Sequence, residues 1–295
     1  MIDIAVIGAG KWGEALHLSF LEKNNSYIAS RHKRDIKNFS DFETLLKSKY
    51  IVLAISAQNI REFLEKNFQY KDQNILVAAK GIELSTGKFL NEVLEEFMPK
   101  ENVAFISGPS FATEVKQKLP TALVINSTNL DLAKKFSNFF PNYIKTYQSD
   151  DVIGAEIAGA YKNVIAIAGG ICDGLGLGNN ARASLISRGL VEMDRFGEFF
   201  GAKKDTFLGL SGAGDLFLTA SSQLSRNYRV GYGLAKGKSL DKILQELGEV
   251  AEGVWTTKAI YKISNKKDIY TPIANEVHHI LQGKNPKDSL KDLLS

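Results

Sequence analysis

The chain has 295 residues, 44% of them hydrophobic and 24% charged, which is enough for two globular domains of ordinary size with buried cores. Its formal net charge is only +4, and its basic residues form no block with interleaved aromatic residues, which argues against nucleic-acid binding. The single cysteine, Cys172, excludes an intramolecular disulfide and a cysteine-rich zinc site, and the four histidines have no metal-ligand spacing. No metal site is therefore expected.

Two apolar segments bear on cellular location. Residues 1–8 lack a basic region and a cleavage site and run straight into glycines, as a strand does and a signal peptide does not. The apolar stretch 153–171 contains Glu156 and Lys162, which are costly at the centre of a bilayer. Together with the single cysteine, these features predict a cytoplasmic protein without membrane contact.

In the first half of the chain, short β-branched runs alternate with amphipathic stretches. The predicted strands are residues 2–7, 26–30, 50–55, 74–79, 103–106, 121–125 and 143–146, and the helices between them are 13–23, 58–66, 88–97 and 130–139. Strands that alternate with helices indicate βαβ units with right-handed crossovers. We therefore expect residues 1–149 to form an α/β domain with a doubly wound, largely parallel sheet.

After about residue 149 the pattern changes to long stretches of helical period. The predicted helices are residues 151–171, 181–200, 212–224, 240–247, 256–266 and 273–282. The polar segment 148–151 is the expected hinge, and its Ser or Asp can N-cap the next helix. Residues 150–295 are therefore expected to form a second, all-helical domain.

The first strand leads into Gly8-Ala9-Gly10-Lys11-Trp12-Gly13, a G-x-G-x-x-G motif that opens a helix. In a Rossmann-type domain Gly8 permits the tight turn, Gly10 lets the backbone approach a pyrophosphate, and Gly13 lets the helix pack close to the sheet. The pyrophosphate would lie at the helix N-terminus, where N–H groups and the dipole favour anions. The motif predicts a dinucleotide site; the alternative is an ordinary glycine turn.

The second strand ends in Ser30-Arg31-His32-Lys33-Arg34, where NAD enzymes usually place an acidic residue for the ribose hydroxyls. A carboxylate would repel a 2′-phosphate, whereas these basic side chains attract one. The pattern therefore favours NADP(H) over NAD(H), with Arg31 and His32 as cofactor contacts. The alternative is that these are solvated loop charges.

Two further loops, residues 80–83 and 107–112, follow strand ends and are expected at the same edge of the sheet. In the second half, Lys162 has Ala158, Gly159, Ala166 and Gly169 as helical neighbours, a small apolar face with room for a ligand. Desolvation of an amine on such a face lowers its pKa toward neutrality, as a proton-transfer group needs. The equally weighted alternative is a surface lysine with a buried stem.

The glycine-rich stretch 210–216 ends at Asp215 and leads to Ser225-Arg226-Asn227. Glycines before an Asp suggest a loop that presents a carboxylate, although a helix N-cap is the commoner role of such an Asp. The planar guanidinium of Arg226 suits a phosphate group.

With these segments in hand, the chain resembles the bacterial NAD(P)-dependent glycerol-3-phosphate dehydrogenases over nearly its whole length. The blocks that carry the resemblance occur in order: GAGKWG (8–13), AKGIE (79–83), SGPSFA (107–112), YKNVIA (161–166), GDL (214–216), SRN (225–227) and AEG (251–253). Together they are far more specific than the glycine motif.

The resemblance implies a reaction and its residues. Lys162 is the implied general acid/base for reduction of dihydroxyacetone phosphate to sn-glycerol 3-phosphate. The implied use of this product is phospholipid synthesis. The implied substrate contacts are Lys80, Gly108, Ser110, Lys162, Asn163, Asp215, Ser225, Arg226 and Asn227. The implied cofactor contacts are Lys11, Trp12, Lys80, Ala112, Arg226, Val250 and Glu252, which join Gly8, Gly10, Gly13, Arg31 and His32 from the motifs above. A homodimer built on the helical domain is also implied.

The sequence departs from the family in two places. Residues 31–50 are fewer than the family usually has, so the helix after the second strand must be truncated, which bears on the adenosine end of the site. Ile55-Ser56-Ala57-Gln58 replaces Val-Pro-Ser-Gln but keeps Gln58. The alternatives are a 6-phosphogluconate- or ketopantoate-type dehydrogenase, and a non-catalytic dinucleotide sensor.

Overall fold

The computed structural model describes residues 2–294, with side chains up to residue 290. The chain forms two compact units: Met1–Lys80 with Leu90–Ala155, and Gly81–Phe89 with Glu156–Ser295. We had expected a boundary between residues 149 and 150 and had placed residues 81–89 in the first domain. Each unit is described by itself below.

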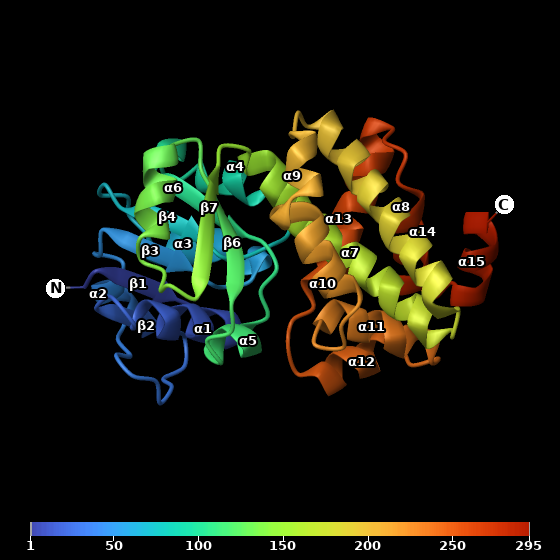
Figure 1. The fold of residues 1–295 in the computed structure, drawn as a ribbon, viewed down its shortest axis with the longest axis horizontal. Coiled ribbons are helices and arrows are strands. Elements are labelled where there is room, and N and C mark those ends of the chain that lie inside the picture. Colours follow the sequence, from blue (N-terminus) through green and yellow to red (C-terminus); the bar gives the residue numbers. More distant parts are fainter. Residues whose placement is uncertain (1, 295) are drawn as a thin grey trace. The chain divides into compact units, whose positions relative to one another are not determined.

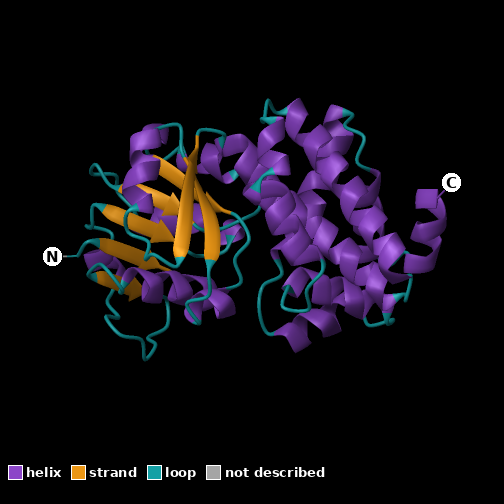
Figure 2. Cartoon of the chain, in the orientation of Figure 1, coloured by secondary structure: helices purple, strands orange, loops and turns teal. Residues whose placement is uncertain are grey.

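The first unit is built on a seven-stranded sheet, which holds all the strands drawn in Figure 2. The strands are β1 Ile4–Ile7, β2 Ser26–Ala29, β3 Tyr50–Leu53, β4 Asn74–Val77, β5 Val103–Ser107, β6 Thr121–Asn126 and β7 Ile144–Ser149. Their order is β2-β1-β3-β4-β5-β6-β7, and every pair is parallel except β5 with β6. The predicted fold class is confirmed.

Alternate residues of each strand point to opposite faces of the sheet, and both faces are covered by helices. In β1, Ile4 and Val6 pack on one face, and Ala5 and Ile7 pack on the other. The helices of this unit are α1 Lys11–Phe20, α2 Phe42–Leu45, η1 Ala57–Asn59, α3 Ile60–Asn67, α4 Leu90–Leu94, η2 Lys100–Asn102, α5 Ala112–Lys116 and α6 Leu130–Ser137. Helices α1, α5 and α6 cover the first face, and α2, α3 and α4 cover the second (Figure 1).

The order reverses between β1 and β3, which is the position where doubly wound sheets bind ligands beyond the carboxyl ends of their strands. The outer edge of the neighbouring strand β2 is covered by residues 38–40. Ile28 donates its N–H to the Asn38 carbonyl oxygen at 3.1 Å, and its own carbonyl accepts from Ser40 at 2.9 Å. The chain therefore returns along β2 after a short loop, and α2 has only four residues, in line with the truncation that we inferred.

The second unit is helical. Its helices are α7 Val152–Gly174, which begins in the first unit, α8 Gly178–Phe199, α9 Lys204–Leu208, η3 Leu210–Gly214, α10 Asp215–Ala220, α11 Arg226–Ala235, α12 Leu240–Leu247, α13 Glu252–Lys267, α14 Pro272–Leu281 and α15 Pro286–Leu294. The prediction of one helix over 212–224 was wrong, because a π-helix (η3) and α10 end by residue 220. We did not predict α9, α11 or α15.

Helix α7 is long and apolar enough to cross a membrane, but 94% of its most apolar window is buried in the fold, as in the core helix of a folded domain. Its glycines allow α11 to approach it closely. A Cβ on Gly170 would lie 1.9 Å from the carbonyl oxygen of Tyr228, and one on Gly231 of α11 would lie 1.9 Å from that of Ile167. Since only glycine fits both positions, these residues fix the α7–α11 contact.

Candidate active site

The glycine motif forms a tight turn between β1 and α1. Gly8 has a φ of +111°, and a Cβ there would lie 2.4 Å from the carbonyl oxygen of Ala54, just after β3. A Cβ on Gly13 would lie 1.9 Å from the carbonyl oxygen of Gly8. Both glycines are therefore required by close backbone approach, as the motif predicted, and the reading as an ordinary turn does not account for Gly13.

Gly10 differs from its two neighbours in the motif. No atom lies within 4 Å of where its Cβ would be, and the residue is exposed. It is the N-cap of α1, whose first turn has no side-chain cap there. An open, glycine-lined helix N-terminus beside the reversal of strand order fits the pyrophosphate of a dinucleotide. Lys11 and Trp12 begin α1 at this position.

The basic residues after β2 are exposed. The Ser30 hydroxyl donates to the carbonyl oxygen of His32 at 2.7 Å, so Arg31 and His32 lie on an ordered turn. The guanidinium of Arg34 donates to the carbonyl oxygen of Ala9 in the glycine motif. The basic loop thus touches the glycine motif through Arg34, a residue that we had not singled out as a contact.

Lys80 and the loop after β5 meet in the first unit. The Lys80 ammonium lies 3.5 Å from the carbonyl oxygen of Gly108, which also accepts from the Ser110 hydroxyl at 3.2 Å. Gly108 has a φ of +106°, and a Cβ there would be 3.0 Å from the Ala122 carbonyl oxygen. Ala112 begins α5 directly after this loop. The structure therefore brings together the implied contacts from residues 80 and 107–112.

In the second unit, Lys162 and Asp215 form a buried ion pair. The Lys162 Nζ lies 2.6 Å from Asp215 Oδ1 and donates to Thr219 Oγ1 at 3.1 Å, and Thr219 donates to Asp215 Oδ1 at 3.2 Å. The Lys162 side chain is 9% exposed and that of Asp215 is 2% exposed. The reading of Lys162 as a surface lysine is therefore wrong. Asp215 and Thr219 are one helical turn apart on α10, so both face the amine.

The glycines around this pair have a different role from the one we inferred. A Cβ on Gly169 would lie 2.5 Å from the carbonyl oxygen of Ala220, so Gly169 admits α10 and not a ligand. A Cβ on Gly212 would lie 2.2 Å from the carbonyl oxygen of Phe207. Residues 210–214 form a π-helix and not a loop, and Asp215 is the first residue of α10 and not its N-cap. Close packing of η3 against α9, and of α10 against α7, thus places the Asp215 carboxylate next to the Lys162 amine.

Asn163, beside Lys162 on α7, belongs to a chain of buried amides. Its Oδ1 accepts from Asn227 Nδ2 at 2.9 Å, and its Nδ2 donates to the carbonyl oxygen of Gly159 at 3.2 Å. Asn227 Oδ1 accepts from the backbone N–H of Gly253 at 3.0 Å. The amides tie α7, α11 and the first turn of α13 together, which fixes the Asn163 side chain relative to that of Lys162.

The other implied contacts of this unit surround the start of α11. Ser225 is buried and N-caps α11 by accepting from the Tyr228 N–H at 3.3 Å. Arg226 is 47% exposed and lies 3.3 Å from Glu249. Val250 is exposed, and Glu252 begins α13. The structure places Arg226 near the segment that holds Val250 and Glu252, which the sequence alone did not indicate.

Sequence reasoning missed a buried carboxylate next to α7. Glu192 of α8 accepts from the Ile273 and Ala274 N–H groups at 2.8 and 2.9 Å, and from the Tyr161 hydroxyl at 2.8 Å. Burial raises the pKa of Glu192, although these hydrogen bonds oppose the shift. Burial also raises the pKa of Tyr161, with the nearby Glu192 charge adding to the effect. The Glu192 carboxylate thus links the N-terminus of α14 to Tyr161 of α7, which is the residue before Lys162.

Two other features bear on ligands. Within residues 2–294, no three His, Cys, Asp or Glu side chains are grouped to hold a metal ion.

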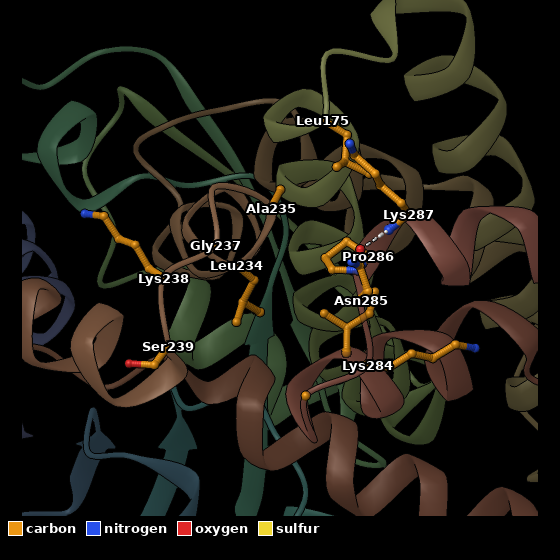
Figure 3. A pocket seen from close by; sticks show the side chains of 12 residues that line it. Leu175, Leu234, Ala235, Gly237, Lys238, Ser239, Lys284, Asn285, Pro286 and Lys287 are labelled. Carbon is orange, nitrogen blue, oxygen red and sulfur yellow. Dashed lines mark hydrogen bonds between the residues drawn. The ribbon is translucent and has the colours of Figure 1, made fainter.

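A cavity of about 490 Å³ lies between the ends of several helices of the second unit (Figure 3). The ammonium groups of Lys238 and Lys284 at its rim pair with Glu246 and Glu276 at 2.6 Å each. None of its lining residues is among the predicted site residues.

Residues 21–133 match the family described as NAD-dependent glycerol-3-phosphate dehydrogenase N-terminus, and residues 151–291 match the corresponding C-terminus. A Sulfurimonas denitrificans protein named glycerol-3-phosphate dehydrogenase (NAD(P)+) is 61% identical over 295 residues, which are all of both chains. A Campylobacter jejuni protein of the same name is 60% identical over 99% of this chain and 98% of its own. The crystal structure of glycerol-3-phosphate dehydrogenase from Coxiella burnetii superposes with a TM-score of 0.92 at 32% identity, covering 100% of this chain and 99% of that one.

Proposed function

Since this chain belongs to the NAD(P)-dependent glycerol-3-phosphate dehydrogenase family, we propose that it reduces dihydroxyacetone phosphate to sn-glycerol 3-phosphate with NAD(P)H, and catalyses the reverse reaction. The observation that carries the proposal is the buried Lys162–Asp215–Thr219 cluster. Membership of this family leaves the 6-phosphogluconate- and ketopantoate-type dehydrogenases without support. The product would supply glycerophospholipid synthesis.

Lys162 acts as the general acid/base. As an ammonium it donates a proton to the C2 carbonyl oxygen of dihydroxyacetone phosphate, and in the reverse direction the amine takes the proton of the C2 hydroxyl. A nicotinamide dinucleotide, when bound at the glycine motif, would supply the hydride for C2. Asp215 and Thr219 hold the amine in one position, so that it is oriented before substrate arrives.

The remaining groups hold the substrate. The guanidinium of Arg226 offers a planar set of donors for the phosphate, and its exposed side chain can leave Glu249 to do so. Asn163 contacts a substrate oxygen from the position that Asn227 fixes. Lys80, Gly108, Ser110 and Ser225 are the further substrate contacts of this proposal, and Val250, Glu252 and Ala112 are cofactor contacts.

The cofactor preference proposed is NADP(H) over NAD(H). Arg31 and Arg34 on the loop after β2 supply positive charge at the position where NAD enzymes carry an acid, and His32 lies between them on the same loop. The contact of Arg34 with Ala9 keeps that charge beside the glycine motif. A cytoplasmic homodimer that associates through the helical unit is part of the same proposal and rests on the family resemblance.

The test of the proposal is the loss of nicotinamide absorbance when dihydroxyacetone phosphate is added to the purified protein with NADPH, and separately with NADH. We expect rapid oxidation of NADPH and slower oxidation of NADH. Equal use of both would retain the reaction and contradict the reading of the basic loop. Cofactor binding without oxidation of either would contradict the reaction and favour the non-catalytic dinucleotide sensor.

A further inference from the structure

His17 is a fully buried histidine that the reaction does not use. It lies on α1, and its Nε2 is 2.8 Å from the carbonyl oxygen of Lys37 while its Nδ1 is 2.9 Å from the hydroxyl of Ser26. Because a carbonyl oxygen only accepts, Nε2 carries the proton, and Nδ1 of the neutral ring accepts from the Ser26 hydroxyl. One side chain therefore joins α1, β2 and the segment after β2.

That segment, residues 30–40, is the basic loop, and side-chain hydrogen bonds hold its middle and its second half. In the middle, Arg34 donates to the carbonyl oxygen of Ala9 in the glycine motif. Three residues later, His17 holds the carbonyl oxygen of Lys37. Asn38 then takes a φ of +55° and donates its side-chain amide to the carbonyl oxygen of Ser26 at 2.9 Å. The loop is too short to carry a full helix, and these side-chain bonds add to the backbone pairing of residues 38–40 with β2 and to the packing of Ile36 and Phe39 against the core.

Helix α1, which carries His17 and begins at the glycine motif, also brings a carboxylate to the loop. Glu14 of α1 lies 4.0 Å from Arg34 and 2.8 Å from Lys116, so the guanidinium is also steered by a carboxylate. A free loop would spread its basic side chains over many positions, and ordering them on binding would cost affinity. A loop fixed before binding avoids that cost for a ligand with a 2′-phosphate, and gives no advantage to a ligand without one.

We propose that His17 is a positioning residue for dinucleotide selectivity, which holds the basic loop so that Arg31, His32 and Arg34 favour a 2′-phosphorylated nicotinamide dinucleotide. The inference rests on the proposed function, because it takes the dinucleotide as the ligand. It predicts that weakening the anchor changes affinity for NADPH more than for NADH.

The experiment measures the dissociation constants of NADPH and NADH by fluorescence titration, which requires no turnover. We expect His17→Leu to weaken NADPH binding about three- to tenfold, the effect of one lost buried hydrogen bond, and NADH binding less than about twofold. His17→Gln, whose amide can donate to Lys37 and accept from Ser26, is expected to restore most of the selectivity. Ser19→Ala is the matched control, because Ser19 is buried on the same helix and its hydroxyl donates to the Ala15 carbonyl oxygen and accepts from the Tyr143 hydroxyl, outside the basic loop.

A second variant covers the case in which His17→Leu does not fold. Asn38→Gly keeps the left-handed backbone but removes the bond to Ser26, and it is expected to shift selectivity in the same direction. The proposal would be overturned if folded His17→Leu or Asn38→Gly kept the wild-type selectivity, or lost affinity for NADPH and NADH equally. A wild-type protein that binds both dinucleotides equally well would also overturn it. Selective NADPH binding with no turnover of dihydroxyacetone phosphate would refute the proposed function and still decide the role of His17.

Discussion

The Lys162 ammonium lies 2.6 Å from the Asp215 carboxylate, and both side chains are buried. The two residues are 53 positions apart in the chain and lie on different helices, α7 and α10. A buried ion pair is weak support for stability, since desolvation of both charges offsets much of their attraction. The role that we propose for Lys162 explains the arrangement better, because an amine that gives and takes a proton needs a fixed position and a fixed counter-charge.

Replacing Asp215 by Asn is expected to reduce kcat by about 100-fold or more and to lower the free energy of unfolding by about 3 kcal/mol. The variant leaves the buried Lys162 ammonium without its counter-charge while keeping the shape of the side chain. Steady-state kinetics and denaturant unfolding measure the two effects. Wild-type kcat in this variant would show that Asp215 does not orient the amine.

The double variant Lys162→Met, Asp215→Leu separates stability from catalysis. It removes both charges together and fills the space with apolar groups, so its free energy of unfolding is expected to recover to within about 1 kcal/mol of the wild type. Its activity should stay lost. A double variant as unstable as Asp215→Asn would mean that the pair stabilises the fold in its own right.

Two glycines of the cofactor motif are expected to respond differently to the same substitution. A Cβ on Gly13 meets the Gly8 carbonyl oxygen at 1.9 Å, so Gly13→Ala should destabilise the protein by about 2 to 3 kcal/mol. The Cβ that Gly10→Ala adds has no neighbouring atom within 4 Å, so this variant should unfold like the wild type. It should bind NADPH more weakly, because the Cβ occupies the space left for the pyrophosphate. Thermal unfolding and NADPH titration distinguish the two, and normal NADPH binding by Gly10→Ala would contradict the placement of the pyrophosphate.

Asn227→Ala breaks the amide chain between Asn163 and the N–H of Gly253. We expect a loss of about 1 to 3 kcal/mol in stability, because buried polar groups lose their partners. The KM for dihydroxyacetone phosphate should rise, since Asn163 is no longer held in place. An unchanged KM in a destabilised protein would assign these amides to the fold alone.

Glu192 predicts a pH dependence of stability. Burial raises the pKa of its carboxyl above the ordinary value of 4.5, so between these two values the folded protein holds a proton that the unfolded chain has released. The contribution of Glu192 to the free energy of unfolding is therefore fully present below pH 4.5, and it is lost as the pH rises through the pKa of the folded state. Denaturant unfolding of wild type and Glu192→Gln across this range should show the wild type losing stability relative to the variant; a gain would contradict the assignment.

Local patterns in the sequence predicted the seven strands of the first unit and its glycine motif. The glycine motif, the strand before it and the helix after it were predicted because backbone crowding at Gly8 and Gly13 restricts the residue type. The truncation near α2 was predicted because residues 31–50 are fewer than in the family that the chain resembles. The antiparallel pairing of β5 and β6 was not predicted, because strand direction depends on partners far along the chain.

The second unit shows where local patterns were insufficient. Helix α11 contains Gly231 and Gly233, which weaken its intrinsic helical preference, and it forms because those glycines let it pack against α7 and α12. Helix η3 reads as a loop for the same reason, since Gly212 is needed only for contact with Phe207. The pairing of Lys162 with Asp215 depends on these tertiary contacts, so the residue types could be nominated from the sequence but their contact could not.

The measurement that tests the account most directly compares wild type with Lys162→Ala in two assays of the same folded protein. One assay titrates NADPH, and the other follows NADPH oxidation on addition of dihydroxyacetone phosphate. We expect Lys162→Ala to bind NADPH within about twofold of the wild type and to lose about 100-fold or more in turnover. Substantial turnover by a folded Lys162→Ala protein would contradict the assignment of Lys162 as the proton donor and acceptor.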